Sequence, residues 1–390
     1  MLKKKPELVY MGKSKKKGFL LPPAVGYSFR VVAYLFGHHT VSLKFLIRAL
    51  LTLLINLINW PFRTYEKLFI NKKYSRKEIE KDPIFIIGHW RSGTTHLHNI
   101  LCQDPQMGYT TTFQSVFPDT LFNKAGRFLF EGFARILIPG TRKGDNVTLG
   151  MELPQEEEFA LGDKTPVCFY YFWMFPRSLK KFYEQFVRFR NTDISMIDSW
   201  KDDYKLLISK ALKNTKRNRF LSKNPPNTAR IKVLLEMFPN ARFIHIHRNP
   251  VEVYLSTRNF FDKMLPHLQL QTIDAKVLDA HVFQLYKDLM KDYLEQRELI
   301  PADHLVELSF DSLEDDPKTC LQNLYKDLNL SGYAASKSYF ESYLNKMKSY
   351  KKNKHQITKE LLEKIQKEWG FAMKEWDYDI PKHIEVKSNE

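Results

Sequence analysis

The chain has 390 residues, of which 43% are hydrophobic and 14% aromatic, and its formal net charge is +17. This apolar content is enough for one large or two modest folded domains, and it excludes a globally disordered chain. The positive charge indicates an anionic partner, which could be a nucleic acid, an acidic membrane or a polyanionic cofactor. The three cysteines (Cys102, Cys168 and Cys320) are too few and too scattered for a disulfide framework or a zinc site.

Residues 1–40 are basic and are predicted to form a partly irregular arm. They lack the pattern of a signal peptide, so we expect a cytoplasmic protein. Residues 41–62 are strongly apolar and predict a helix that Pro61 should end, followed by a charged connector over 63–82. The uninterrupted apolar part is too short to span a bilayer. Two interpretations stay open: a helix packed in the core, or a helix lying in a membrane interface.

The stretch 83–98 predicts a buried strand, a loop and a helix. Ile84 to Ile87 are apolar without alternation, as in a strand that is covered on both faces. Gly88 and Gly93 allow a tight turn and the close approach of a ligand, and Thr94 opens the helix. Backbone N–H groups at such a helix start favour a phosphate or a sulfate.

The spacing of Gly88 and Gly93 matches that of a Walker A loop, but the next residue does not. Nucleoside triphosphatases have lysine after the second glycine, whereas this chain has Thr94. The cation of the loop is instead Arg91. The sequence therefore predicts a phosphate cradle without the groups that bind magnesium triphosphate, and we expect no metal.

Further apolar segments alternate with helical patterns along the chain. Strands are expected over 219–222, 241–247 and 304–308, each followed by a turn and a helix, and the tail from 357 onwards predicts a helix that packs back. The fold class is therefore α/β: a P-loop-like parallel sheet with helices on both faces and an extra N-terminal helical segment. We expect two parts, at 1–75 and 76–390. Ligands bind such sheets beyond the carboxyl ends of the strands, where Arg91, Lys223 and Arg248 should converge.

The loop from Gly88 to Thr95, Gly-His-Trp-Arg-Ser-Gly-Thr-Thr, resembles that of sulfotransferases that use 3′-phosphoadenosine 5′-phosphosulfate (PAPS). A second signature of this family is an arginine after a strand with a serine eight residues on, as in Arg248 and Ser256. Lys223-Asn224-Pro225 resembles the strand end that touches the transferring sulfonate. The resemblance covers residues 80–330.

The resemblance implies two anion sites for PAPS. The 5′ end of the donor would be bound by Arg91, Ser92, Gly93, Thr94 and Thr95, and the 3′-phosphate by Arg248 and Ser256. Lys223 and Arg91 would stabilise charge on the oxygens of the sulfonate during transfer. At the adenine site, Phe310-Asp311-Ser312-Leu313 departs from the Tyr-Glu-Asp-Leu of related enzymes.

A general base should remove the proton of the acceptor hydroxyl. The resemblance points to the acids in Pro154-Gln155-Glu156-Glu157-Glu158, which is similar to a Pro-x-Glu-Asp-Glu pattern of this branch. Glu156 and Glu158 match the residue type, but the sequence does not choose among the three acids. His89 and His98 are the alternatives.

The predicted reaction is in-line transfer of the PAPS sulfonate to an acceptor hydroxyl. The acceptor would be a small molecule, a lipid or other amphipathic alcohol, or a glycan; the apolar stretch 41–62 and the aromatic run 169–175 favour a lipid. We expect possible membrane contact through 41–62 and no nucleic-acid partner, and the sequence predicts no oligomeric state. The alternatives are a P-loop nucleotide kinase or NTPase, and a non-catalytic membrane-surface protein on the same fold.

Overall fold

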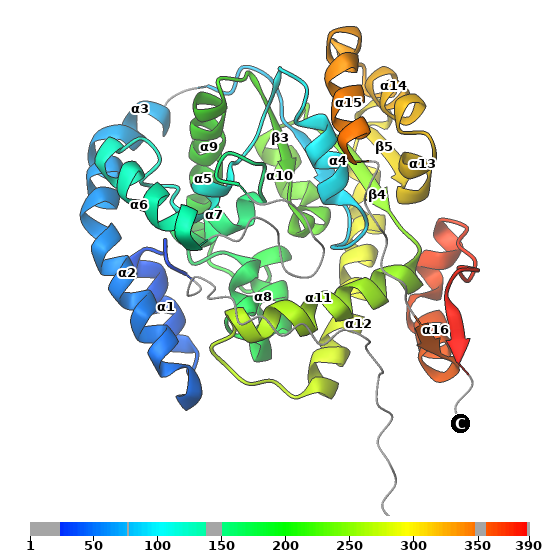
Figure 1. Cartoon of the computed structure of the whole chain (residues 1–390), viewed down its shortest axis with the longest axis horizontal. Helices are drawn as coiled ribbons and strands as arrows, with labels where there is room; N and C mark the ends of the chain where they lie inside the picture. The colour runs from blue at the N-terminus through cyan, green and yellow to red at the C-terminus, as the bar shows by residue number, and fades with distance from the viewer. Residues whose placement is uncertain (1–23, 76–77, 138–149, 348–355, 388–390) are drawn as a thin grey trace, which may run out of the picture.

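The computed structural model (Figure 1) describes residues 24–75, 78–137, 150–347 and 356–387. Its centre is a parallel sheet with the strand order β2-β3-β1-β4-β5. The strands are β1 (Ile84–Ile87), β2 (Met107–Gly108), β3 (Arg219–Lys223), β4 (Arg242–His247) and β5 (Leu305–Ser309). Two short strands near the C-terminus, β6 (Gln356–Thr358) and β7 (Glu385–Lys387), pair separately.

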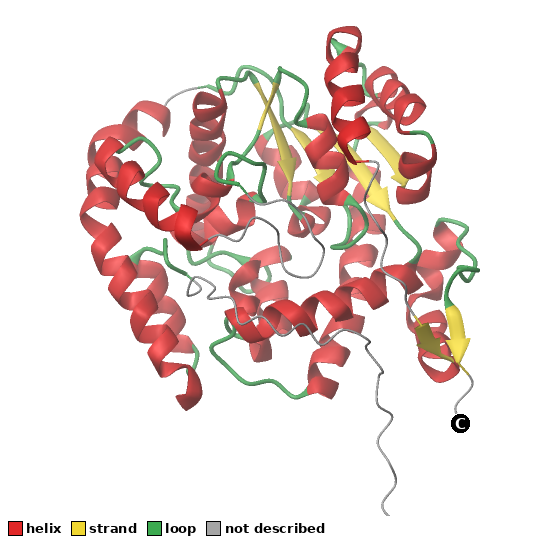
Figure 2. Ribbon diagram, viewed as in Figure 1, coloured by secondary structure: helices red, strands yellow, loops and turns green. Residues whose placement is uncertain are grey.

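Helices cover both faces of the sheet (Figure 2). The side chains of β1 alternate between two cores. Ile84 and Ile86 belong to a core shared with α4 (Thr94–Leu101) and α14 (Pro317–Asp327), whereas Phe85 and Ile87 belong to a core shared with α12 (Ala275–Gln296). This two-sided burial explains the unbroken apolar run, and it confirms the predicted α/β class.

The remaining helices surround this sheet. Those after β2 are α5 (Thr112–Val116), α6 (Lys124–Leu137), α7 (Glu157–Lys164), α8 (Leu179–Phe182), α9 (Ile194–Thr215), α10 (Ile231–Met237), α11 (Pro250–Leu268), α13 (Phe310–Asp315), α15 (Tyr333–Met347) and α16 (Lys359–Glu375). α16 is the expected closing helix. The ring of Trp369 is fully buried and stacks on Tyr286, with 3.9 Å between ring centroids.

The N-terminal part differs from the prediction in two respects. Residues 29–38 form a helix, α1 (Phe29–His38), where an irregular arm was expected; its Val31 and Leu35 are buried in the core, while 1–23 lie outside the described residues. Pro61 does not end the next helix. It lies inside α2 (Leu46–Tyr65), which continues through η2 (Glu66–Ile70) into α3 (Asn71–Ser75). Much of the expected connector 63–82 is therefore helical, and the division at residue 75 stays a prediction.

A buried network of charges explains why the helix continues. Arg63 of α2 donates to Asp119 at 3.1 Å, and Lys210 of α9 pairs with Glu66 at 2.7 Å. Asp119 also binds Lys164 at 2.9 Å. Burial opposes ionisation of Asp119, but the surrounding cations hold its pKa well below the ordinary value. Before Pro61, Asn59 accepts from the hydroxyl of Thr120 at 2.9 Å. Contacts on both sides of Pro61 thus hold the helix in place and offset the cost of the proline.

The aromatic run 169–175 was one of the two features of the sequence that favoured a lipid acceptor. It begins with the short helix η3 (Phe169–Trp173), and all seven side chains are buried. Most of the run is therefore core. Tyr170 reaches the candidate site described below.

We predict that Lys210→Met destabilises the protein by about 3–5 kcal/mol, because it leaves the buried Glu66 without its cation. Chemical denaturation monitored by circular dichroism measures the free energy of unfolding. The matched control is Lys213→Met, an exposed position on the same helix that should change stability by less than about 0.5 kcal/mol. A loss below about 1 kcal/mol for Lys210→Met would contradict the role given to the network.

Candidate active site

The loop after β1 is tightly enclosed by its neighbours. Gly88 has a φ of 137°, and a Cβ atom there would lie 2.3 Å from the carbonyl oxygen of Ile246. The N–H of Gly88 donates to the hydroxyl of Thr228 at 2.7 Å. A residue with a side chain cannot occupy this position without moving β4. These contacts fix the path of the loop between β4 and η6 (Pro225–Ala229).

The end of the loop passes under an aromatic ring. Gly93 has a φ of 93°, and a Cβ atom there would lie 2.2 Å from the ring of Phe310. The same ring packs under the guanidinium of Arg248, at 4.6 Å from the ring centroid. Phe310 therefore connects the predicted 5′ loop to the predicted 3′-phosphate arginine. Immediately after Gly93, the N-terminus of α4 begins with Thr94 and Thr95.

The two predicted anion sites touch each other. Arg91 has a φ of 74°, which is unusual for a residue with a side chain. Its Nε donates to the hydroxyl of Ser256 at 2.9 Å. Arg248 instead donates twice to the carboxylate of Glu252, at 3.0 and 3.2 Å. Arg91 and Ser256 are thus in direct contact, whereas Arg248 has an acidic partner that the sequence did not indicate.

Lys223, at the end of β3, contacts one of the three predicted acids. Its ammonium donates to Glu156, and both side chains are almost entirely buried. The other oxygen of Glu156 accepts from the hydroxyl of Tyr170, which in turn accepts from the indole N–H of Trp90 at 2.9 Å. The carboxylate of Glu156 is therefore linked both to the β3 lysine and to the loop that carries Arg91.

The other two acids have different surroundings. Glu158 accepts two hydrogen bonds from Arg230, at 2.7 and 3.0 Å. Burial opposes its ionisation, but Arg230 outweighs this and lowers the pKa of Glu158. Glu157 accepts from the hydroxyls of Ser222 and Tyr204. Burial raises the pKa of Glu157, because these neutral partners offset only part of the desolvation cost.

The two candidate histidines are buried and poorly basic. Burial lowers the pKa of His89 to about 4, and its Nδ1 lies 2.7 Å from the carbonyl oxygen of Trp90 within the loop. Burial, together with the nearby charge of Lys223, lowers the pKa of His98 to about 3. Neither imidazole is among the partners of Glu156 described above.

Two residues of the site, Tyr170 and Arg230, carry no recognisable signature in the sequence. Tyr170 is one of seven consecutive aromatic or methionine side chains, and nothing marks it out from its neighbours. Arg230 lies 72 residues from Glu158, so only the folded chain brings the pair together. Phe310, in contrast, had a signal, because the family resemblance placed it in a segment that departs from the Tyr-Glu-Asp-Leu pattern.

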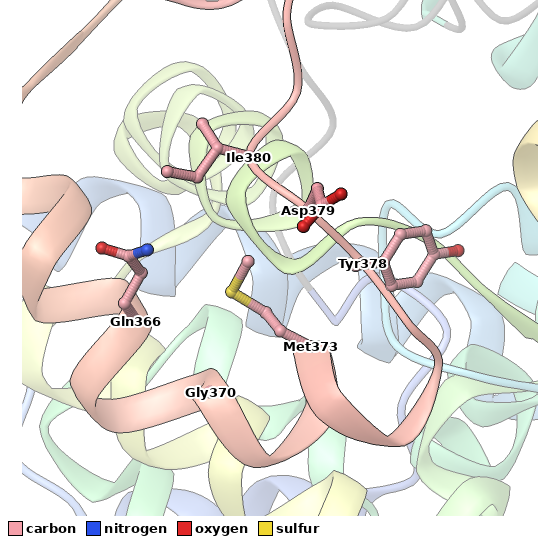
Figure 3. Close-up of a pocket in the computed structure, with 6 residues that line it drawn as sticks. All are labelled: Gln366, Gly370, Met373, Tyr378, Asp379 and Ile380. Carbon is pink, nitrogen blue, oxygen red and sulfur yellow. The ribbon is translucent and has the colours of Figure 1, made fainter.

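A surface hollow of about 510 Å³ lies beside the C-terminal helix (Figure 3). Figure 3 shows the segment Tyr378–Ile380 running over α16, from which Gln366 and Met373 project. Tyr378 contacts the ring of His247, at the end of β4, with 2.8 Å between the hydroxyl and Nδ1. The hollow adjoins this strand end but contains none of the predicted site residues.

Comparison with known proteins identifies the family. The sequence profile of the sulfotransferase family matches residues 83–335. An omega-hydroxy-beta-dihydromenaquinone-9 sulfotransferase from Mycobacterium bovis is 30% identical over 333 residues, which cover 85% of this chain and 84% of the relative. The protein of the same name from Mycobacterium tuberculosis matches equally well.

Solved structures agree on the fold. A sulfotransferase from Mycobacterium avium superposes with a TM-score of 0.63 at 18% identity and covers 83% of this chain and 82% of its own. A second, from Mycobacterium tuberculosis, gives a TM-score of 0.59 at 14% identity and covers 80% and 85%. These findings decide against the kinase or NTPase interpretation that the Walker-like spacing had left open. The chain belongs to the sulfotransferase family.

Proposed function

We propose that this sulfotransferase takes its sulfonate from PAPS and transfers it to the hydroxyl of an amphipathic lipid. The contact that carries the proposal is the buried pair of Lys223 and Glu156, at the carboxyl end of β3 and linked through Tyr170 to the Arg91 loop. A base and a cation that lie together at a strand end suit the two requirements of sulfonate transfer. These are removal of a proton and stabilisation of negative charge.

The residues at the strand ends suit a donor with two anionic groups. The loop offers Arg91 and the N-terminus of α4 to the 5′-phosphosulfate, with Ser92, Gly93, Thr94 and Thr95 as its further contacts. Arg248 and Ser256 offer a guanidinium and a hydroxyl to the 3′-phosphate. Because Glu252 already binds Arg248, a phosphate must share that guanidinium or displace the carboxylate.

PAPS supplies an activated sulfonate. The acceptor oxygen forms a bond to sulfur, the bond from sulfur to the 5′-phosphate oxygen breaks, and adenosine 3′,5′-bisphosphate leaves. Glu156 receives the proton of the acceptor hydroxyl, while Lys223 and Arg91 stabilise charge on the sulfonate and on the leaving oxygen. We assign this role to Glu156 because Glu158 is bound to Arg230, and Glu157 lies between two hydroxyl groups.

An amphipathic acceptor is favoured by the side chains around Glu156. Phe159 packs against Tyr170, with 4.7 Å between ring centroids, yet its side chain is 36% exposed. Leu153, just before the acids, is 39% exposed. An apolar tail can bind to such side chains while its hydroxyl reaches Glu156. The relative named for a menaquinone-derived alcohol supports the same class of acceptor.

We predict that Arg248→Ala weakens the binding of adenosine 3′,5′-bisphosphate about 10- to 100-fold, because it removes charged hydrogen bonds worth about 1.5–3 kcal/mol. Isothermal titration calorimetry measures the dissociation constant. Arg190→Ala, at a side chain that is 64% exposed, is the matched control and should bind like wild type. If Arg248→Ala bound with wild-type affinity, the two-site arrangement would be wrong.

We predict that Glu156→Gln lowers kcat about 10²- to 10⁴-fold, because glutamine cannot accept the proton. Purified enzyme is incubated with PAPS and a total lipid extract, and mass spectrometry quantifies the sulfated lipid that forms. Affinity for adenosine 3′,5′-bisphosphate should stay within threefold of wild type, which shows that the donor site is folded. Glu152→Gln, at an exposed carboxylate four residues earlier, should retain full activity.

Two outcomes would contradict these assignments. Wild-type turnover by Glu156→Gln would show that Glu156 is not the general base, and Glu157 would become the next candidate. If a parallel incubation with water-soluble sugars gave a sulfated product and the lipid extract gave none, the lipid acceptor would be refuted and the donor site left intact.

A further inference from the structure

Helix α2 buries the opposite side from that buried by a surface helix of a water-soluble domain. The side that packs on the protein is mostly polar, with Ala49, Thr52, Asn56, Asn59 and Arg63 buried. The side that faces outward is apolar; we call it the apolar face of α2, and its exposed residues are Leu46, Ile47, Leu50, Leu51, Leu54, Leu57, Ile58 and Trp60. Soluble amphipathic helices bury their apolar stripe instead.

Specific contacts fix this inverted orientation. Asn56 donates to the carbonyl oxygen of Ala24 at 2.9 Å, and Asn59 accepts from Thr120 at 2.9 Å. Arg63 joins the buried charge network described above. A rotation that buried the leucines would break these contacts and leave the partners unpaired, at a cost of about 1–3 kcal/mol for each neutral group and more for the ions.

The apolar surface extends beyond α2. Leu43 before it is 85% exposed, and Phe69 in η2 is 69% exposed. On α6, which lies beside α2 in Figure 1, Phe128 is 84% exposed. The two helices are packed together, since Phe62 and Phe130 meet edge to face at 6.0 Å. One side of the molecule therefore carries a broad apolar surface over α2, η2 and α6.

The charges around this surface match an anionic membrane. Between residues 24 and 75 the sequence has seven Lys or Arg residues and one acid, Glu66, which is fully buried against Lys210. The exposed cations lie at both ends of the apolar face, with Lys44 near its start and Lys67, Lys72 and Lys73 beyond its end. Arg30 also lies near the end, because it follows Phe29, whose ring contacts Trp60 with 6.4 Å between ring centroids. Cations that flank an apolar helix favour binding to acidic headgroups.

We propose that α2, η2 and α6 form a docking surface that inserts side-on into the interface of an anionic lipid bilayer. The helical stretch Leu43–Ser75 is long and apolar enough to cross a membrane by length and composition alone. A spanning helix would, however, expose Asn56, Asn59 and Arg63 to hydrocarbon, whereas side-on insertion keeps them bound to the protein. Trp60 and Tyr65, each 52% exposed, suit the level of the headgroups.

This surface connects to the proposed base through one short helix. Arg63 donates to the carbonyl oxygen of Asp163 at 2.8 Å, near the end of α7, and Glu156 precedes the first residue of the same helix. Eight helical residues span about 12 Å, so bilayer docking would bring the candidate site close to the lipid interface. This consequence rests on the proposed role of Glu156, whereas the docking surface itself does not.

Vesicle flotation of the full chain tests the proposal. We expect the wild-type protein to float with vesicles of phosphatidylcholine containing 30% phosphatidylglycerol, and much less with phosphatidylcholine alone. The double variant Leu50→Glu/Leu57→Glu should reduce the floated fraction at least tenfold. The matched control is Ile194→Glu, at an apolar side chain that is 74% exposed at the start of α9, and it should float like wild type.

The following readouts decide the outcome. Circular dichroism on the same proteins checks that they are folded. Calorimetry with adenosine 3′,5′-bisphosphate tests the donor site separately, so a loss of donor binding can be distinguished from a loss of membrane docking. Failure of the wild-type protein to float would overturn the proposal. So would equal flotation of the double variant, or sedimentation as a dimer that the double variant dissociates, because the apolar face would then bind a second copy of the chain.

Discussion

The structure depends on the pairing of buried charges. Burial of a carboxylate or an ammonium group costs several kcal/mol unless an oppositely charged group and further hydrogen bonds compensate for the lost hydration. Two acids of one short segment meet this requirement with different cations: Glu158 pairs with Arg230, and Glu156 pairs with Lys223. Glu156 joins the start of α7 to the end of β3, and Glu158 joins α7 to the residue between η6 and α10. Charge pairing therefore fixes the elements at the carboxyl edge of the sheet relative to one another.

The same requirement orients the N-terminal helix. Asp119 and Glu66 attract Arg63, Lys164 and Lys210 into one network, and the polar side of α2 must follow Arg63 inward. The leucines of α2 are left facing outward as a consequence. An apolar outer surface is thus not a packing defect. It results from a network of buried ion pairs that holds the polar side of α2 against the protein.

Local patterns predicted the parts of the fold that local chemistry determines. The buried strands were predictable because burial on both faces requires an unbroken apolar run. Gly88 and Gly93 were predictable because a positive φ and a close neighbour favour glycine at the position itself. Pro61 does not end α2, because its local penalty is offset by contacts such as that of Arg63 with Asp119, 56 residues away. Likewise, the sequence could not separate the three glutamates. Their surroundings come from Arg230 and Lys223, more than 60 residues along the chain.

Glu156 differs from Glu158 in the surroundings of its cationic partner. Arg230 holds Glu158 in a bidentate, fully buried pair, so any movement of that carboxylate would leave an unpaired ion in the core. Lys223 instead lies at the end of a strand, where the transferring sulfonate would offer its ammonium a second anion. A carboxylate whose cation can be shared in this way can accept a proton without leaving a buried charge unpaired. Among the three acids, that condition fits Glu156, and it links the choice of base to the arrival of the donor.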